Sequence, residues 1–162
     1  MAVMTDTIYQ MNVTYSADED RLLLRITTQQ GDEFRVWLTR RYCALLMGVL
    51  EKEIDKRGGL PVVASTPQTR QMFRQGAMDK PFDEEGTRRL PLGETGFLAY
   101  QISTMEKPDD NLGLELRPQT GQGVTINLNQ SLLFMFHNLL TQGIDRAGWN
   151  LPERHSANEN IH

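Results

Sequence analysis

Apolar and polar residues follow the same pattern in two stretches of the chain, 21–59 and 111–149, which align without a gap at an offset of 90 positions. In each stretch, two alternating segments precede apolar residues at helical spacing, which predicts a β-hairpin followed by an amphipathic helix. Nine residues of the first stretch recur in the second: Leu22, Leu24, Gln29, Gly31, Leu38, Leu50, Ile54, Asp55 and Gly58. Convergence on one pattern is the alternative to duplication, and the absence of gaps favours duplication.

The alternation also predicts the hairpin register. Apolar residues must face each other across the hairpin, because a slip of one residue would turn the core face to solvent. This condition pairs Leu24 with Val36 and leaves 29–31 as a three-residue loop. Such loops place their last residue in the left-handed region, where glycine costs least. Gly31 and Gly121 occupy that position in the two hairpins.

Each hairpin leads into a helix and follows a further strand. Thr39 and Asn129 stand where helix N-caps are expected, and Gly58 and Gly148 stand where the helices should stop. Alternating residues predict the upstream strands: Tyr9, Met11, Val13 and Tyr15 in the first copy, and Leu98, Tyr100 and Ile102 in the second. Each copy is therefore predicted to be a β-β-β-α unit.

These elements predict an α+β fold in which a pseudo-twofold pair of β-β-β-α units packs antiparallel strands, in one sheet or two, against two helices. A chain of 162 residues with 39% apolar and 23% charged residues is long enough and apolar enough for one such domain. We expect a single domain over 1–162, with repeats at about 8–59 and 97–149, a Pro-rich acidic linker at 60–96 and a polar tail at 150–162.

Composition narrows the compartment and the classes of partner that we expect for this chain. The net charge of −4 argues against non-specific binding to nucleic acid or anionic membranes. The single cysteine, Cys43, cannot form an internal disulfide, which suits a reducing compartment. The N-terminal segment has no secretory pattern, and no apolar run approaches the roughly 20 residues that a membrane span needs. We expect a soluble, cytoplasmic protein without membrane contact.

The two hairpins differ on the face that points away from the predicted core. In the first, Arg25 faces Arg35 and Leu23 faces Trp37, and the paired arginines call for an anionic neighbour. The matching residues of the second are small or nearly neutral: Gly113, Glu115, Thr125 and Asn127. The candidate contact surface comprises Arg21, Leu23, Arg25, Arg35, Trp37, Arg40 and Arg41.

This basic and aromatic face leaves several hypotheses open. The first is a non-enzymatic interaction or adaptor protein whose partner is another protein or a second copy of the chain. The alternative is single-stranded nucleic-acid binding, with arginines on phosphates and Trp37 stacked on a base. A purely structural explanation is that the acidic linker segment 83–85 covers the arginines, with Trp37 and Leu23 packed beneath it or at a subunit interface.

No residue pattern predicts a catalytic centre, a metal site or a cofactor. Cys43 aligns with Leu133, and His137 aligns with Met47, which favours packing roles for both. The remaining candidates are two histidines of the polar tail and two aspartates at helix ends: His155, His162, Asp55 and Asp145. An enzyme with an unrecognised site between the repeats is the third hypothesis, and it would need Cys43, His137 and a carboxylate to meet.

Three segments resemble parts of a family of small uncharacterised bacterial proteins: LTRR at 38–41, RRLPLGE at 88–94 and DRAGWNLP at 145–152. The resemblance spans about 12–152 and implies no activity, ligand or functional residue. In outline, a duplicated strand-rich unit that ends in a helix is also similar to Whirly and PUR-type single-strand-binding proteins. Their repeats have four strands before the helix, whereas three are predicted here.

Overall fold

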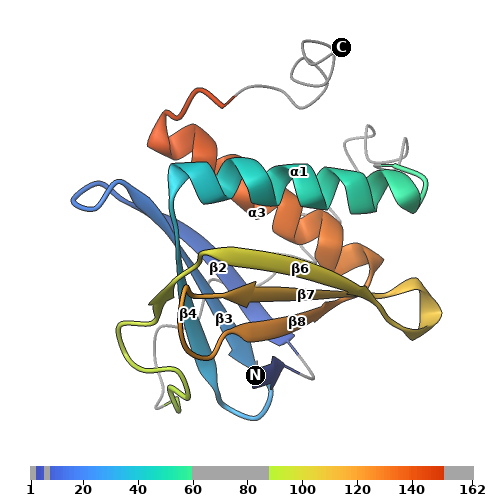
Figure 1. Cartoon of the computed structure of the whole chain (residues 1–162), viewed down its shortest axis with the longest axis horizontal. Helices are drawn as coiled ribbons and strands as arrows, with labels where there is room; N and C mark the ends of the chain where they lie inside the picture. Colours follow the sequence, from blue (N-terminus) through green and yellow to red (C-terminus); the bar gives the residue numbers. More distant parts are fainter. Residues whose placement is uncertain (1–2, 6–7, 60–87, 152–162) are drawn as a thin grey trace.

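In a computed structural model, the described part of the chain forms two four-stranded sheets and two long helices (Figure 1). The structure describes residues 3–5, 8–59 and 88–151. The first unit contains β2 (Ile8–Ser16), β3 (Arg21–Thr28), β4 (Glu33–Leu38) and α1 (Arg40–Lys56). The second contains β6 (Gln101–Glu106), β7 (Leu112–Arg117), β8 (Val124–Leu128) and α3 (Gln130–Ala147). The predicted α+β class and the two β-β-β-α units are confirmed.

The predicted register of the first hairpin is also confirmed. Leu24 pairs with Val36, and Arg25 pairs with Arg35 across β3 and β4. The loop glycines Gly31 and Gly121 have φ angles of 88° and 103°, in the left-handed region that favours glycine. Alternation and loop chemistry therefore determine which side chains of the hairpin enter the core.

Side-chain caps begin both helices where the sequence predicts them. Thr39 Oγ1 accepts a hydrogen bond of 3.1 Å from the backbone N–H of Tyr42, and Asn129 Oδ1 accepts one of 2.8 Å from that of Leu132. These oxygens satisfy amide groups that have no partner within the helix.

No helix within the described residues is both long and apolar enough to cross a membrane.

Each unit completes the sheet of the other with one short strand. The first strand, β1 (Val3–Thr5), runs parallel to β8, and β5 (Phe97–Leu98) runs parallel to β4. Both sheets are therefore mixed at one edge. The single upstream strand predicted from Leu98 to Ile102 is wrong, because the chain changes sheet within it: the N–H of Ala99 bonds to Trp37 of the first sheet, and that of Tyr100 bonds to Arg117 of the second.

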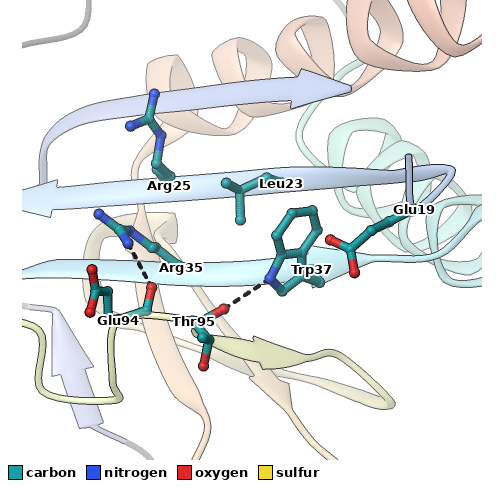
Figure 2. A pocket seen from close by; sticks show the side chains of 7 residues that line it. All are labelled: Glu19, Leu23, Arg25, Arg35, Trp37, Glu94 and Thr95. Carbon is teal, nitrogen blue, oxygen red and sulfur yellow. Dashed lines mark hydrogen bonds between the residues drawn. The ribbon is translucent and has the colours of Figure 1, made fainter. Parts of the chain in front are cut away.

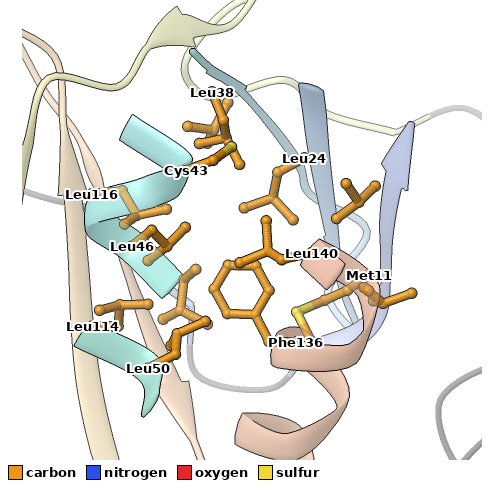
Figure 3. Close-up of a cluster of buried hydrophobic side chains, with 14 of the residues drawn as sticks. Met11, Leu24, Leu38, Cys43, Leu46, Leu50, Leu114, Leu116, Phe136 and Leu140 are labelled. Atoms are coloured by element: carbon orange, nitrogen blue, oxygen red, sulfur yellow. The ribbon is translucent and has the colours of Figure 1, made fainter. Parts of the chain in front are cut away.

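The helices are exchanged between the two units, as the short strands are. At Gly143 of α3, a Cβ would lie 2.8 Å from Val13 Cγ1 of β2, so this helix packs closely on the sheet of the first unit. Figure 3 shows Phe136 and Leu140 of α3 toward Met11 and Leu24, with Leu46 and Leu50 of α1 toward Leu114 and Leu116 of β7. Buried residues of both units form one hydrophobic core.

The end of each helix is fastened to a turn of the other unit. Trp149, just after α3, donates a hydrogen bond of 3.0 Å from Nε1 to Asp20 in the turn between β2 and β3. Arg57, just after α1, donates one of 2.9 Å from Nε to the carbonyl of Asp110, which ends the turn η2 (Pro108–Asp110) between β6 and β7. A hydrogen bond from the Tyr15 hydroxyl contributes most to lowering the pKa of Asp20. The two units are thus joined at both ends of the helix pair.

Candidate functional site

The outer face of the first sheet carries a hollow of about 440 Å³, which we call the outer hollow (Figure 2). Strands β3 and β4 contribute four of its lining residues because alternate side chains of the hairpin point away from the core. The turn after β2 contributes one residue, and the segment before β5 contributes two. The lining residues are Glu19, Leu23, Arg25, Arg35, Trp37, Glu94 and Thr95.

Four of the seven predicted contact residues meet in the outer hollow, namely Leu23, Arg25, Arg35 and Trp37. The other three, Arg21, Arg40 and Arg41, are not among its lining residues. Arg40 donates a hydrogen bond of 3.3 Å to the carbonyl of Asn150, and Arg21 lies 3.8 Å from the Glu19 carboxylate. Arg41 is exposed at the start of α1. The predicted surface is therefore divided between the hollow and the region around it.

The arginines of the hollow are held by neighbouring groups. Arg35 Nε donates to Glu33 Oε2 at 2.6 Å, and its Nη1 donates to the carbonyl of Glu94 at 2.6 Å. Glu33 is only 3% exposed and also accepts from Arg88 at 2.9 Å. Arg25 donates to Asn12 at 3.2 Å. The anionic neighbour expected from the sequence is thus Glu33 of the same strand, and the acidic segment 83–85 lies outside the described residues.

Trp37 uses the only polar atom of its side chain to hold the wall of the hollow. Its Nε1 donates a hydrogen bond of 2.9 Å to the carbonyl of Thr95, and Figure 2 shows the indole between Leu23 and Glu19. Because the N–H is satisfied internally, the ring itself is what Trp37 contributes to the lining. Leu98 of β5 pairs with Trp37 of β4 and is 40% exposed, so the apolar surface continues to the sheet edge.

Three lining residues were not predicted from the sequence: Glu19, Glu94 and Thr95. The last two approach because Gly96 has a φ of 72° and lies against the backbone of Arg35, where a Cβ would overlap the Arg35 carbonyl. The Gly93 and Gly96 pair was the one sequence signal of this close approach. The carboxylates change the character of the face, because Glu19 and Glu94 balance the two arginines and the predicted basic platform is close to neutral.

On the corresponding face of the second sheet, neighbouring side chains cover the position of Gly113. Gly113 is buried, and a Cβ there would lie 2.6 Å from Met105 Cγ and 2.9 Å from Lys107 Cε. Glu115 accepts a hydrogen bond of 3.1 Å from Ser103 and lies 3.1 Å from Arg117 Nε. The two faces therefore differ in shape at the aligned positions of Leu23 and Gly113.

Among the described residues, Cys43 and His137 lie in different surroundings. Cys43 is fully buried, and burial raises the pKa of its thiol to about 12. His137 Nε2 lies 3.7 Å from a carboxylate oxygen of Glu51. Within residues 3–5, 8–59 and 88–151, no group of three or more His, Cys, Asp and Glu side chains is arranged to hold a metal ion. His155 and His162 lie outside the described residues.

The raised pKa of Cys43 predicts a loss of stability at alkaline pH. The thiol of an unfolded chain ionises near pH 8.5, whereas the folded thiol ionises near pH 12, so its contribution is complete below about pH 8.5 and is lost as the pH rises towards 12. At about pH 11 the expected loss is about 3 kcal/mol. Urea unfolding at about pH 8 and about pH 11 measures it. Cys43→Ala should show a smaller difference between the two pH values, and an equal difference would contradict this explanation.

Comparison of the chain with protein-family models, with curated proteins and with solved structures gave no match. Functional inference therefore depends on the chemistry of the described residues themselves.

Proposed function

We propose that the chain is a non-enzymatic interaction protein that binds a segment of a partner protein in the outer hollow. The observation that carries the proposal is a half-buried Trp37 and Leu23 at the floor of a hollow with a charged rim. Protein interfaces combine an apolar centre with a polar rim, and tryptophan is enriched among the residues that contribute most to binding. A concave site suits a protruding segment better than a flat surface.

The arrangement of charge favours a protein partner over single-stranded nucleic acid. Phosphate binding needs arginines whose donors point at the ligand. Two donor atoms of Arg35 instead bond to Glu33 and to the Glu94 carbonyl, and the carboxylates of Glu19 and Glu94 lie at the rim. Phosphates would meet these carboxylates as they approached, which opposes binding of a polyanion.

The test compares two apolar-to-polar substitutions. The chain serves as bait in an extract of the cells that produce it, and each captured protein is purified and titrated by calorimetry. Leu23→Ser should weaken the interaction by about tenfold or more, because it removes an apolar side chain from the floor without adding a charge. Leu45→Ser is the control, since Leu45 is 51% exposed on α1 and does not line the hollow. A charge reversal at Arg35 is unsuitable, because it would also disturb buried Glu33.

Three results decide between the hypotheses. Equal binding by wild type and Leu23→Ser for every captured protein would contradict the proposal. Concentration-dependent self-association that Leu23→Ser removes would identify the partner as a second copy. Fluorescence anisotropy of single-stranded DNA or RNA that is salt-sensitive and lost in Trp37→Ala would favour the nucleic-acid alternative instead.

A further inference from the structure

We infer that the outer hollow receives a basic side chain, lysine or arginine, which lies on the indole of Trp37 and reaches the carboxylate of Glu19. This inference rests on the proposed function and specifies the chemistry of the partner. It reverses the expectation from sequence, in which the basic residues of the face were the contact groups. The net charge of −4 agrees with a cationic partner.

The charged groups of the outer hollow differ in how easily a ligand can reach them. Arg35 is held on two sides, by buried Glu33 and by the wall carbonyl of Glu94. Glu19 lies on an exposed turn with 46% of its side chain accessible, and its neighbour Arg21 is 3.8 Å away in an open pair. Exposed pairs of this kind contribute little to stability, so a ligand cation can displace Arg21 at little cost.

The indole ring of Trp37 forms part of the floor of the outer hollow. Cations are attracted to the face of an indole, and the attraction is strongest for tryptophan. The N–H of Trp37 is turned to the Thr95 carbonyl, which leaves the ring to form the floor beside Leu23. Lysine and arginine carry apolar stems that pack on such surfaces while their charged ends reach polar groups. Trp37, Leu23 and Glu19 therefore match the three parts of a basic side chain.

The position of the two arginines in the outer hollow decides how strongly they repel a basic side chain of the partner. Figure 2 shows Arg25 and Arg35 at one end, Glu19 at the other, and Leu23 and Trp37 between them. Arg35 shares the Glu33 carboxylate with Arg88, at 2.6 Å and 2.9 Å, and exposed Glu94 adds a second carboxylate at the arginine end. A cation at the Glu19 end is thus separated from the arginines by the apolar floor. An acidic ligand would meet these carboxylates.

The experiment is an NMR titration of the indole N–H of Trp37 with blocked tripeptides. The probes are Gly-Arg-Gly, Gly-Lys-Gly, Gly-Glu-Gly and Gly-citrulline-Gly, in which citrulline keeps the shape of arginine without its charge. The arginine and lysine peptides should shift the signal saturably and bind about tenfold or more tightly than the citrulline peptide. Glu19→Gln should weaken the arginine peptide by a similar factor. Asp18→Asn, which removes the neighbouring exposed charge, is the matched control and should change little.

Each other outcome overturns the inference. Equal binding of arginine and citrulline peptides would mean that the charge is not recognised, and tighter binding of the glutamate peptide would return the contact role to the arginines. No shift with any peptide would mean that the hollow does not receive a basic side chain. The partner titration with Leu23→Ser changes no charge and is independent of these results, so the proposed function can stand when this inference fails.

Discussion

Replacement of Phe136 by alanine should lower the free energy of unfolding by about 3–5 kcal/mol, the usual cost of removing a buried phenyl ring. Phe136 is 0% exposed and lies on the helix that the second unit contributes to the first sheet. Figure 3 shows its ring between Met11 on one side and Leu50 on the other. The cavity would therefore open between both units, and neither unit alone could close it.

Urea unfolding followed by circular dichroism measures this effect, with Leu45→Ala as the control for loss of an exposed apolar side chain. The control should change the free energy of unfolding by less than about 0.5 kcal/mol. A loss below about 1 kcal/mol for Phe136→Ala would contradict the shared core. Two separate unfolding transitions in wild type would contradict it as well, because a shared core should unfold cooperatively.

Gly96→Ala is expected to have the second largest effect and to act on the outer hollow directly. A Cβ at this position would overlap the Arg35 carbonyl, and the φ of 72° is itself unfavourable for alanine. The strand edge would have to move away from β4, which breaks the bond from Trp37 to Thr95 that holds the wall. We expect a loss of about 2–4 kcal/mol in the free energy of unfolding and loss of partner binding.

Gly93→Ala is the matched control for this prediction. Gly93 has a φ of 95°, but among the described residues no heavy atom beyond its chain neighbours lies within 4 Å of the position its Cβ would take. This substitution therefore adds only the backbone strain, roughly 1–2 kcal/mol. The difference between the two variants in denaturant unfolding measures the close approach at Gly96. Equal losses would mean that the wall of the hollow tolerates a side chain there.

Local patterns were sufficient for the hairpins and helices but not for the exchange of elements between units. The pairing of Leu24 with Val36 needs only neighbouring residues, because alternation and the glycine loop specify it. The alternation of Leu98, Tyr100 and Ile102 continues across the point where the chain changes sheet. Periodicity reports which residues face the core, and it carries no information about which sheet a strand joins.

The same limit applies to the outer hollow. The register correctly placed Leu23 beside Trp37 and Arg25 beside Arg35. The partners that set the chemistry of the site are distant in sequence, since Arg35 bonds to Glu94 across 59 positions and Trp37 bonds to Thr95 across 58. The burial of Glu33 was equally hidden, because an outward position on a strand is expected to be solvated. Charge counted along two strands therefore overestimated how basic the face is.

The exchange of helices has a consequence for how the chain folds as it leaves the ribosome. More than 100 residues separate β2 from α3, the helix that covers it. Contacts between such distant segments raise the contact order, and high contact order slows folding. The part of the inner face of β2 and β3 that α3 covers must remain exposed until α3 has been synthesised. During that interval the nascent chain exposes the apolar face of this sheet, which is the kind of surface that chaperones bind.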